Sequence, residues 1–196
     1  MKELLMRYPI LTACEDDINS AIELAVSTYS AGGKVLLCGT GGSAADCDHI
    51  AGELLKGFLS ARKVTSENLP EELREHLQGS LPAISLPSLT AALTASLNDL
   101  DPAFAYAQLL HGIGKKGDLL IAISTSGNAE NVCNAAFLAN AKGIKVLALT
   151  GKSGGRLSKL SDVTIRVPEN ETYRIQELHL PVYHYICAAI EAKMFN

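Results

Sequence analysis

Five short apolar runs, separated by helix-length segments, constrain the fold of this chain more than any other feature. The runs are rich in branched residues, which indicates buried strands, and they occupy residues 35–38, 82–86, 118–124, 144–150 and 163–167. Parallel strands need long crossovers, and the segments between the runs are long enough to supply helical ones. The alternation therefore predicts an α/β fold with a five-stranded, mostly parallel sheet and helices on both faces.

Helical patterns also precede, connect and follow the predicted strands. Residues 4–31 carry apolar side chains at helical spacing and end at Gly32-Gly33, which predicts one long helix or two. Residues 173–194 predict a closing helix that Pro181 interrupts with a kink or an irregular turn. Segment 60–80 is polar, and we interpret it as a solvated surface insertion in which Pro70 is suited to begin a short helix. The connecting helical segments are 89–97 with 102–113, 128–142 and 155–160.

Length, charge and cysteine content limit the class of protein. We expect a single domain over residues 1–196, with a helical segment at 1–31, because this length allows one sizeable core. The formal net charge of −4 offers no positive surface for nucleic acid or an anionic membrane. The five scattered cysteines indicate reduced thiols, and no apolar run suggests a signal peptide or approaches the ~18 residues of a membrane span. These features predict a soluble, cytoplasmic protein without a nucleic-acid or membrane partner.

A glycine-rich turn follows the first strand, at the edge where parallel sheets bind ligands. The turn Gly39-Thr40-Gly41-Gly42-Ser43 leads into a helical pattern, so free N–H groups and the helix dipole suit an anion. It also fits the G-x-G-x-x-A dinucleotide fingerprint, but the second strand ends in Leu86-Pro87-Ser88, without the acidic residue that would hold a ribose. No Lys-Ser or Lys-Thr follows the glycines, so ATP or GTP hydrolysis is not indicated. The turn favours another phosphate-bearing ligand.

A second polar loop, Ser124-Thr125-Ser126-Gly127-Asn128, follows the third strand. Hydroxyl groups around a flexible glycine at a helix N-terminus can surround a phosphate with neutral donors. The same residues also suit an ordinary helix cap, with Ser126 or Asn128 as the capping residue. Local sequence leaves both interpretations open, although two such loops in one sheet favour phosphate binding.

Two helical patterns carry candidates for metal binding or acid/base chemistry. His49 and Glu53 are four residues apart and share one helix face, a spacing used for metal ligands and for a base beside its orienting group. Gln176, His179 and His184 follow in the closing helix. Taken singly, such residues are more often packed or surface residues than ligands, so the spacing alone does not decide.

The motifs taken together, in order and at matching spacing over residues 18–192, resemble the sugar isomerase (SIS) domain family. The phosphoheptose isomerase branch, whose members are also called sedoheptulose 7-phosphate isomerases, is the most similar. The motifs that carry the resemblance are Gly39-x-Gly41-Gly42-Ser43, Asp46-x-x-His49-x-x-x-Glu53, Asn98-Asp99, Ser124-Thr125-Ser126-Gly127-Asn128, Thr150-Gly151-Lys152-x-Gly154-Gly155 and Arg174-Ile175-Gln176-Glu177-x-His179-x4-His184.

The resemblance implies a three-layer α/β/α sandwich that assembles as a homotetramer with active sites between subunits. It also implies one zinc ion per subunit and a sugar phosphate as the ligand. By position, the serine-rich loop would hold the phosphate, the glycine turn and the Asn-Asp pair would contact the sugar, and Gln176 would serve both substrate and metal. The implied substrate-binding residues are Thr40, Gly41, Gly42, Ser43, Asn98, Asp99, Ser124, Thr125, Ser126 and Gln176, and the implied zinc ligands are His49, Glu53, Gln176 and His184.

The implied reaction converts sedoheptulose 7-phosphate to D-glycero-D-manno-heptose 7-phosphate through a cis-enediol(ate), as a step of heptose biosynthesis. An aldose–ketose isomerase needs a base near carbon and an acid near oxygen, and the resemblance assigns these roles to Glu53 and His184. Two alternatives remain: a non-catalytic phosphosugar-binding or DnaA-initiator-associating protein, and an isomerase for another sugar phosphate. The chain departs from the family pattern at Thr40 and Ala129, where asparagine and serine are usual, and at Pro181.

Overall fold

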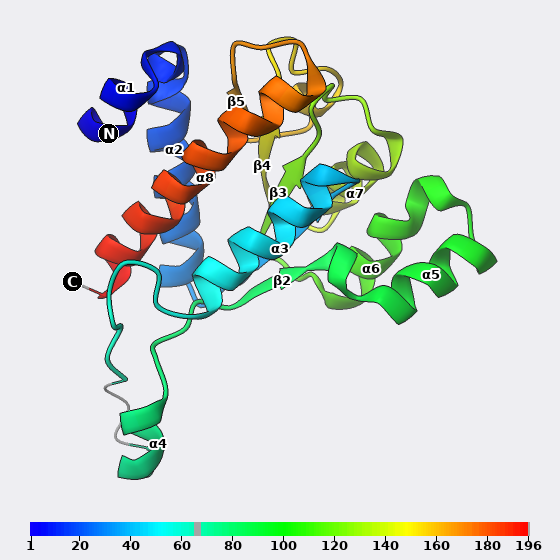
Figure 1. The fold of residues 1–196 in the computed structure, drawn as a ribbon. Coiled ribbons are helices and arrows are strands. Elements are labelled where there is room, and N and C mark those ends of the chain that lie inside the picture. The colour runs from blue at the N-terminus through cyan, green and yellow to red at the C-terminus, as the bar shows by residue number, and fades with distance from the viewer. Residues whose placement is uncertain (65–67, 196) are drawn as a thin grey trace.

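A five-stranded parallel sheet forms the centre of the protein (Figure 1). The structure is a computed structural model that describes residues 1–64 and 68–195. The sheet has the order β2-β1-β3-β4-β5, and every neighbouring pair is parallel. This arrangement confirms the predicted fold class, and each strand falls within or overlaps its predicted run. The strands are β1 (Val35–Gly39), β2 (Ala83–Ser85), β3 (Leu119–Ile123), β4 (Lys145–Thr150) and β5 (Val163–Arg166).

Alternate residues of each strand face opposite layers of helices, because side chains in a strand point to alternate faces. In β1, Val35 and Leu37 belong to one buried cluster, whereas Leu36 and Cys38 belong to the other. The first cluster packs against α1 (Lys2–Arg7), α2 (Glu15–Ser30), α3 (Gly42–Leu55) and α8 (Thr172–Phe195). The second packs against α5 (Thr90–Asp99), α6 (Ala105–Ile113) and α7 (Glu130–Ala141). The result is a sandwich of helix, sheet and helix layers (Figure 1).

Two predictions about helices need correction. Pro181 forces no irregular turn, since α8 is continuous from Thr172 to Phe195. Proline removes one helical hydrogen bond, but its neighbours His179, Val182 and Tyr183 are buried, so tertiary packing holds both sides of the helix in place. Residues 155–160 form only a 3-10 turn, η4 (Leu157–Lys159), which follows two glycines in left-handed conformations. The other 3-10 turns are η1 (Pro9–Cys14), η2 (Leu86–Ser88) and η3 (Pro102–Phe104).

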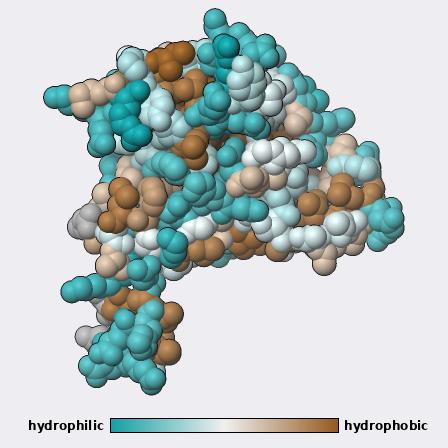
Figure 2. Space-filling model, in the orientation of Figure 1, coloured by the Kyte–Doolittle hydropathy of each residue, from teal (hydrophilic) through white to brown (hydrophobic). Residues whose placement is uncertain are grey.

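Most of the described residues of the polar segment 60–80 form an arm that projects from the body of the protein (Figures 1 and 2). A short helix, α4 (Glu71–His76), begins directly after Pro70 as predicted, and none of its residues is buried. Residues 65–67 of the predicted insertion lie outside the described residues. Arg62 departs from the prediction of a solvated segment, because only 3% of its surface is exposed. Within residues 1–64 and 68–195, no helix has the length and apolar character needed to cross a membrane.

His179 is fully buried on α8 and makes the fold sensitive to acid. Its Nε2 lies 3.3 Å from the carbonyl oxygen of Thr150, and its Nδ1 has no hydrogen-bond partner in the described part of the chain. Burial, only partly offset by the Thr150 hydrogen bond, lowers the pKa of His179 from 6.5 to about 4. Between these two values the unfolded chain binds more protons than the folded one, so stability must fall as the pH falls.

We expect acidification from pH 7 to pH 4 to remove about 3 kcal/mol of unfolding free energy through His179. Urea unfolding of the wild type and of His179→Gln at several pH values measures this contribution. The stability difference between the two proteins should be constant above pH 7 and should shift in favour of the variant below pH 6. His76→Gln, which changes an exposed histidine of α4, is the matched control. Parallel pH profiles for wild type and His179→Gln would contradict the expectation.

Candidate active site

The glycine turn sets the direction in which α3 leaves the sheet. Gly41 adopts a φ of +65°, a conformation that favours glycine. A Cβ atom on Gly42 would lie 2.5 Å from Nε2 of Gln176, so the absence of a side chain lets α3 approach α8 closely. Thr40 Oγ1 accepts a hydrogen bond of 3.1 Å from the Asn131 side chain of α7. The turn is therefore fixed between α7 and α8, as a rigid start for α3.

His49 and Glu53 of α3 meet His184 of α8 at the site. His49 Nε2 lies 3.2 Å from Glu53 Oε1 and 3.3 Å from His184 Nε2. One potential ligand atom from each of the three residues lies within 4.8 Å of the other two. The side chain of His49 is 42% exposed and that of Glu53 14%, so the cluster is open on one side. The structure thus brings together three of the residues that the sequence predicted to work together.

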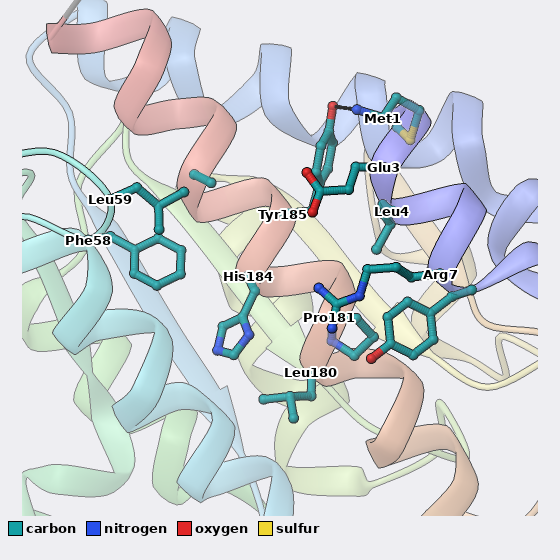
Figure 3. Close-up of a pocket in the computed structure, with 12 residues that line it drawn as sticks. Met1, Glu3, Leu4, Arg7, Phe58, Leu59, Leu180, Pro181, His184 and Tyr185 are labelled. Atoms are coloured by element: carbon teal, nitrogen blue, oxygen red, sulfur yellow. Dashed lines mark hydrogen bonds between the residues drawn. The ribbon is translucent and has the colours of Figure 1, made fainter.

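A pocket of about 610 Å³ opens beside His184, between α8, α1 and the loop after α3 (Figure 3). Phe58 and His184 lie with their ring centroids 5.7 Å apart at its wall. Arg7 of α1 approaches the pocket from the opposite side, beside Pro181 (Figure 3), and Tyr8, the residue after α1, also lines the pocket. The pocket therefore gives a small molecule access to His184.

The cluster has the chemistry of a divalent metal site. Glu53 Oε2 is buried and has no hydrogen-bond partner among the residues that the structure describes, which leaves an acceptor free for a cation. Burial lowers the pKa of His184, and the neighbouring His49 lowers it further, while Glu53 acts in the opposite direction. Histidine nitrogens with lone pairs and a carboxylate oxygen form a donor set that suits zinc. The three residues therefore fit the implied metal.

Tyr183 lies behind His49 and links it to Asp46. The Tyr183 hydroxyl lies 3.0 Å from His49 Nδ1 and 3.3 Å from Asp46 Oδ1. Burial raises the pKa of the Tyr183 phenol, and the Asp46 carboxylate raises it further. The sequence analysis quoted Asp46 within a motif but gave it no role, and it missed Tyr183. A tyrosine within an apolar helix pattern is usually interpreted as core, so the sequence alone gave little signal of this contact.

Gln176 contacts the glycine turn, two helical turns before His184. The rise of an α-helix separates these two positions of α8 by about 12 Å along its axis. Gln176 therefore lies where the turn between Gly39 and Gly42 could share a ligand with it. Its predicted part as a fourth metal ligand remains a prediction.

The serine-rich loop presents hydroxyl groups before α7, but the prediction that Ser126 or Asn128 caps this helix is wrong. The residue that caps α7 is Ala129, without a side-chain hydrogen bond. Ser126 Oγ instead accepts from the N–H of Asn128 at 3.1 Å, and Ser124 Oγ accepts from the N–H of Ala129 at 3.4 Å. Because both hydroxyls accept from backbone groups, their own hydrogens stay available to a ligand oxygen. Gly127, at a φ of +66°, makes the turn possible by approaching Gly154 closely.

Asn98 and Asp99 stand apart from the His49 cluster. They end α5, are exposed, and bond to each other through Asn98 Nδ2 and Asp99 Oδ1 at 2.8 Å. α5 belongs to the helix layer on the opposite face of the sheet from α3 and α8. Within this chain, the fold does not bring the predicted pair to the other site residues.

Comparison with known proteins decides the family. The model of the SIS domain matches residues 5–151. The chain belongs to the SIS domain family. The phosphoheptose isomerase of Aliarcobacter butzleri is 38% identical to it, over 94% of this chain and 89% of the relative. That of Nitratiruptor is 44% identical, over 81% and 76%.

Solved structures agree with this assignment to the SIS domain family. Phosphoheptose isomerase GmhA from Neisseria gonorrhoeae superposes with a TM-score of 0.80 and 32% identity, covering 97% of this chain and 94% of its own. The phosphoheptose isomerase from Francisella tularensis gives the same TM-score and identity, with 95% and 91% covered. These comparisons confirm the resemblance and the predicted three-layer fold.

Proposed function

We propose that this SIS-domain protein is a phosphoheptose isomerase that interconverts sedoheptulose 7-phosphate and D-glycero-D-manno-heptose 7-phosphate. The observation that carries the proposal is the meeting of Glu53 and His184, from different helices, at one open cluster. The names of the relatives, which match most of the chain at 38–44% identity, support the same reaction. Isomerisation between neighbouring carbons needs one proton acceptor and one proton donor, and this pair supplies both.

We assign the zinc site to His49, Glu53 and His184, with Gln176 as the fourth ligand. The orphaned Oε2 atom of Glu53 supports this assignment, because a buried carboxylate oxygen needs a partner. When bound, zinc would polarise the sugar carbonyl and stabilise negative charge on its oxygen.

The proposed substrate spans the two loops at the carboxyl edge of the sheet. Ser124, Thr125 and Ser126 would donate to the phosphate at the start of α7, where the helix dipole favours an anion. The glycine turn and Gln176 would line the sugar, which lies between phosphate and cluster. The turn residues are Thr40, Gly41, Gly42 and Ser43.

The proposed proton transfer uses only the two titratable groups. Glu53 takes the proton from the carbon next to the carbonyl, and His184 gives a proton to the carbonyl oxygen, which produces the cis-enediol. Glu53 then returns its proton to the neighbouring carbon, while His184 recovers one from the second hydroxyl.

We further propose a cytoplasmic homotetramer of single-domain chains, with active sites between subunits. Asn98 and Asp99 would then reach the sugar bound by a neighbouring subunit. Exposed apolar side chains beside this pair, at Leu97, Leu100 and Phe104, support a subunit contact at α5. Figure 2 has brown, apolar residues at the end of the molecule where α5 lies.

Turnover of sedoheptulose 7-phosphate tests the proposal. We expect the purified protein to form the aldoheptose phosphate, and metal removal by a chelator to reduce kcat/KM about 10²-fold or more, since a Lewis-acid metal contributes several kcal/mol. Added zinc should restore the rate. A panel of C5 to C7 ketose phosphates identifies the preferred substrate. A rise in melting temperature with sugar phosphate, without turnover in zinc, would instead support a non-catalytic binding protein.

A further inference from the structure

A buried tyrosine, Tyr183, lies within hydrogen-bond distance of His49. Tyr183 is 3% exposed, and its ring meets that of His49 edge-on, with centroids 5.4 Å apart. Its hydroxyl is within hydrogen-bond distance of His49 Nδ1 at 3.0 Å and Asp46 Oδ1 at 3.3 Å. Asp46 lies three residues before His49, so α3 presents both side chains to the same hydroxyl of α8.

The single hydrogen of the phenol fixes the direction of these bonds. An ionised carboxylate can only accept, so the Tyr183 O–H donates to Asp46. The phenol oxygen is then left as an acceptor, and His49 must donate to it from Nδ1. If Tyr183 instead donated to His49, Asp46 would have no side-chain donor in the described residues, where its Oδ2 already lacks one. A buried carboxylate oxygen without a donor is costly. Glu53 loses the His49 donor in the first arrangement but has His184 within reach in the same cluster, whereas Asp46 has no second side-chain donor among the described residues, so the first arrangement is favoured.

We propose that Asp46 and Tyr183 form a positioning pair that holds His49 in its Nδ1–H tautomer. The lone pair on Nε2 then faces Glu53 and His184, the two other residues of the cluster. The proposal deepens the proposed function, because its consequence for zinc depends on the metal site assigned above. Hydrogen bonds to the outer nitrogen of a metal-binding histidine orient the ring and raise its basicity. Asp46 and Tyr183 therefore act through His49 and do not touch the substrate.

Tyr183→Phe removes the hydroxyl and keeps the packed ring. In the metal-free protein, NMR of the His49 ring nitrogens should report the Nδ1–H tautomer for the wild type. The variant should shift to the Nε2–H tautomer, because Glu53 Oε1, at 3.2 Å, becomes the best acceptor that remains. Zinc affinity, measured by competition with a chromophoric chelator, should fall 10–100-fold. Saturating zinc should recover most of the lost turnover, which a purely catalytic defect would not allow.

Tyr185→Phe is the matched control, since the Tyr185 hydroxyl contacts the amino terminus of Met1 and not His49 (Figure 3). It should leave both the tautomer and the zinc affinity unchanged. Asp46→Ala frees Tyr183 to donate to Nδ1, so it should produce the same tautomer shift as Tyr183→Phe. An unchanged His49 tautomer in Tyr183→Phe would overturn the proposal. A tautomer shift in a protein that binds no zinc would uphold the positioning pair and refute the proposed metal site.

Discussion

Replacing Glu191 with glutamine should reduce the free energy of unfolding by about 3–5 kcal/mol, the cost of breaking a buried ion pair from one side. Glu191, on α8, is 3% exposed and bonds to Nε of Arg62 at 2.6 Å. Its oxygens also accept from the backbone N–H groups of Phe58, Leu59 and Ser60. Glutamine would present an NH₂ group to these donors and leave the Arg62 charge buried without a counter-charge.

The same ion pair connects the two helices of the cluster. Arg62 donates to the carbonyl oxygens of Leu54 and Glu53 at 2.6 and 2.8 Å, at the end of α3. Its φ of +39° is unusual for a residue with a side chain, so these bonds must offset local strain. Burial alone would raise the pKa of Glu191, but its backbone and Arg62 hydrogen bonds lower it below the usual value. Loss of Glu191 should therefore loosen α3 close to Glu53.

Glu23→Gln is the matched control for this measurement. Glu23 pairs with Lys193, only two residues beyond Glu191 on α8, but the two side chains are 66% and 48% exposed. An exposed pair contributes roughly 0–1 kcal/mol, so this variant should unfold close to the wild-type midpoint in guanidinium chloride. Equal destabilisation by Glu191→Gln and Glu23→Gln would contradict the role of the buried pair.

The sequence predicts the sheet and the helix that carries His49 and Glu53 well, for physical reasons. Five fully or mostly buried parallel strands produce continuous apolar runs that few other structures produce. Gly41 adopts a positive φ, and a side chain on Gly42 would clash with Gln176 of α8, so the turn requires glycine at both positions. The glycines therefore reveal the turn in the sequence. His49 and Glu53 are four residues apart, so a single helix is enough to place both side chains on one face. Each of these features depends on residues close together in the sequence, so the sequence pattern alone predicts it.

The features that sequence could not supply depend on contacts between distant segments. Arg62 lies in a polar stretch, and its burial becomes evident only when Glu191, 129 residues later, is placed beside it. The role of Tyr183 depends on Asp46, 137 residues earlier. Pro181 was expected, from its own chemistry, to interrupt the helix with a kink or an irregular turn, whereas α8 is continuous and packs against α2 and α3. Asn98 and Asp99 lie on the other helix layer, which no spacing in the sequence indicates.

Glu53→Gln should lower kcat for sedoheptulose 7-phosphate by about 10²–10⁴-fold, the usual contribution of a general base. Glutamine keeps an oxygen that can bind a cation and has nearly the same shape, but it cannot take a proton from carbon. KM should therefore change little, and saturating zinc should keep the site occupied although the amide binds the metal more weakly than the carboxylate. Initial rates at saturating zinc, with the metal content of each sample determined, measure the effect.

His184→Ala removes the proposed acid and one metal ligand at once, so its rate and its zinc affinity should both fall. The two variants thus separate the roles: a loss of rate with zinc retained identifies the base, and a joint loss identifies the residue that serves both functions. Glu75→Gln, on the exposed helix α4, is the control and should be as active as the wild type. Undiminished turnover in both Glu53→Gln and His184→Ala would remove the assigned roles and place the base and the acid on other residues. His184 lines the pocket and Glu53 Oε2 has no partner among the described residues, so we expect both variants to lose turnover.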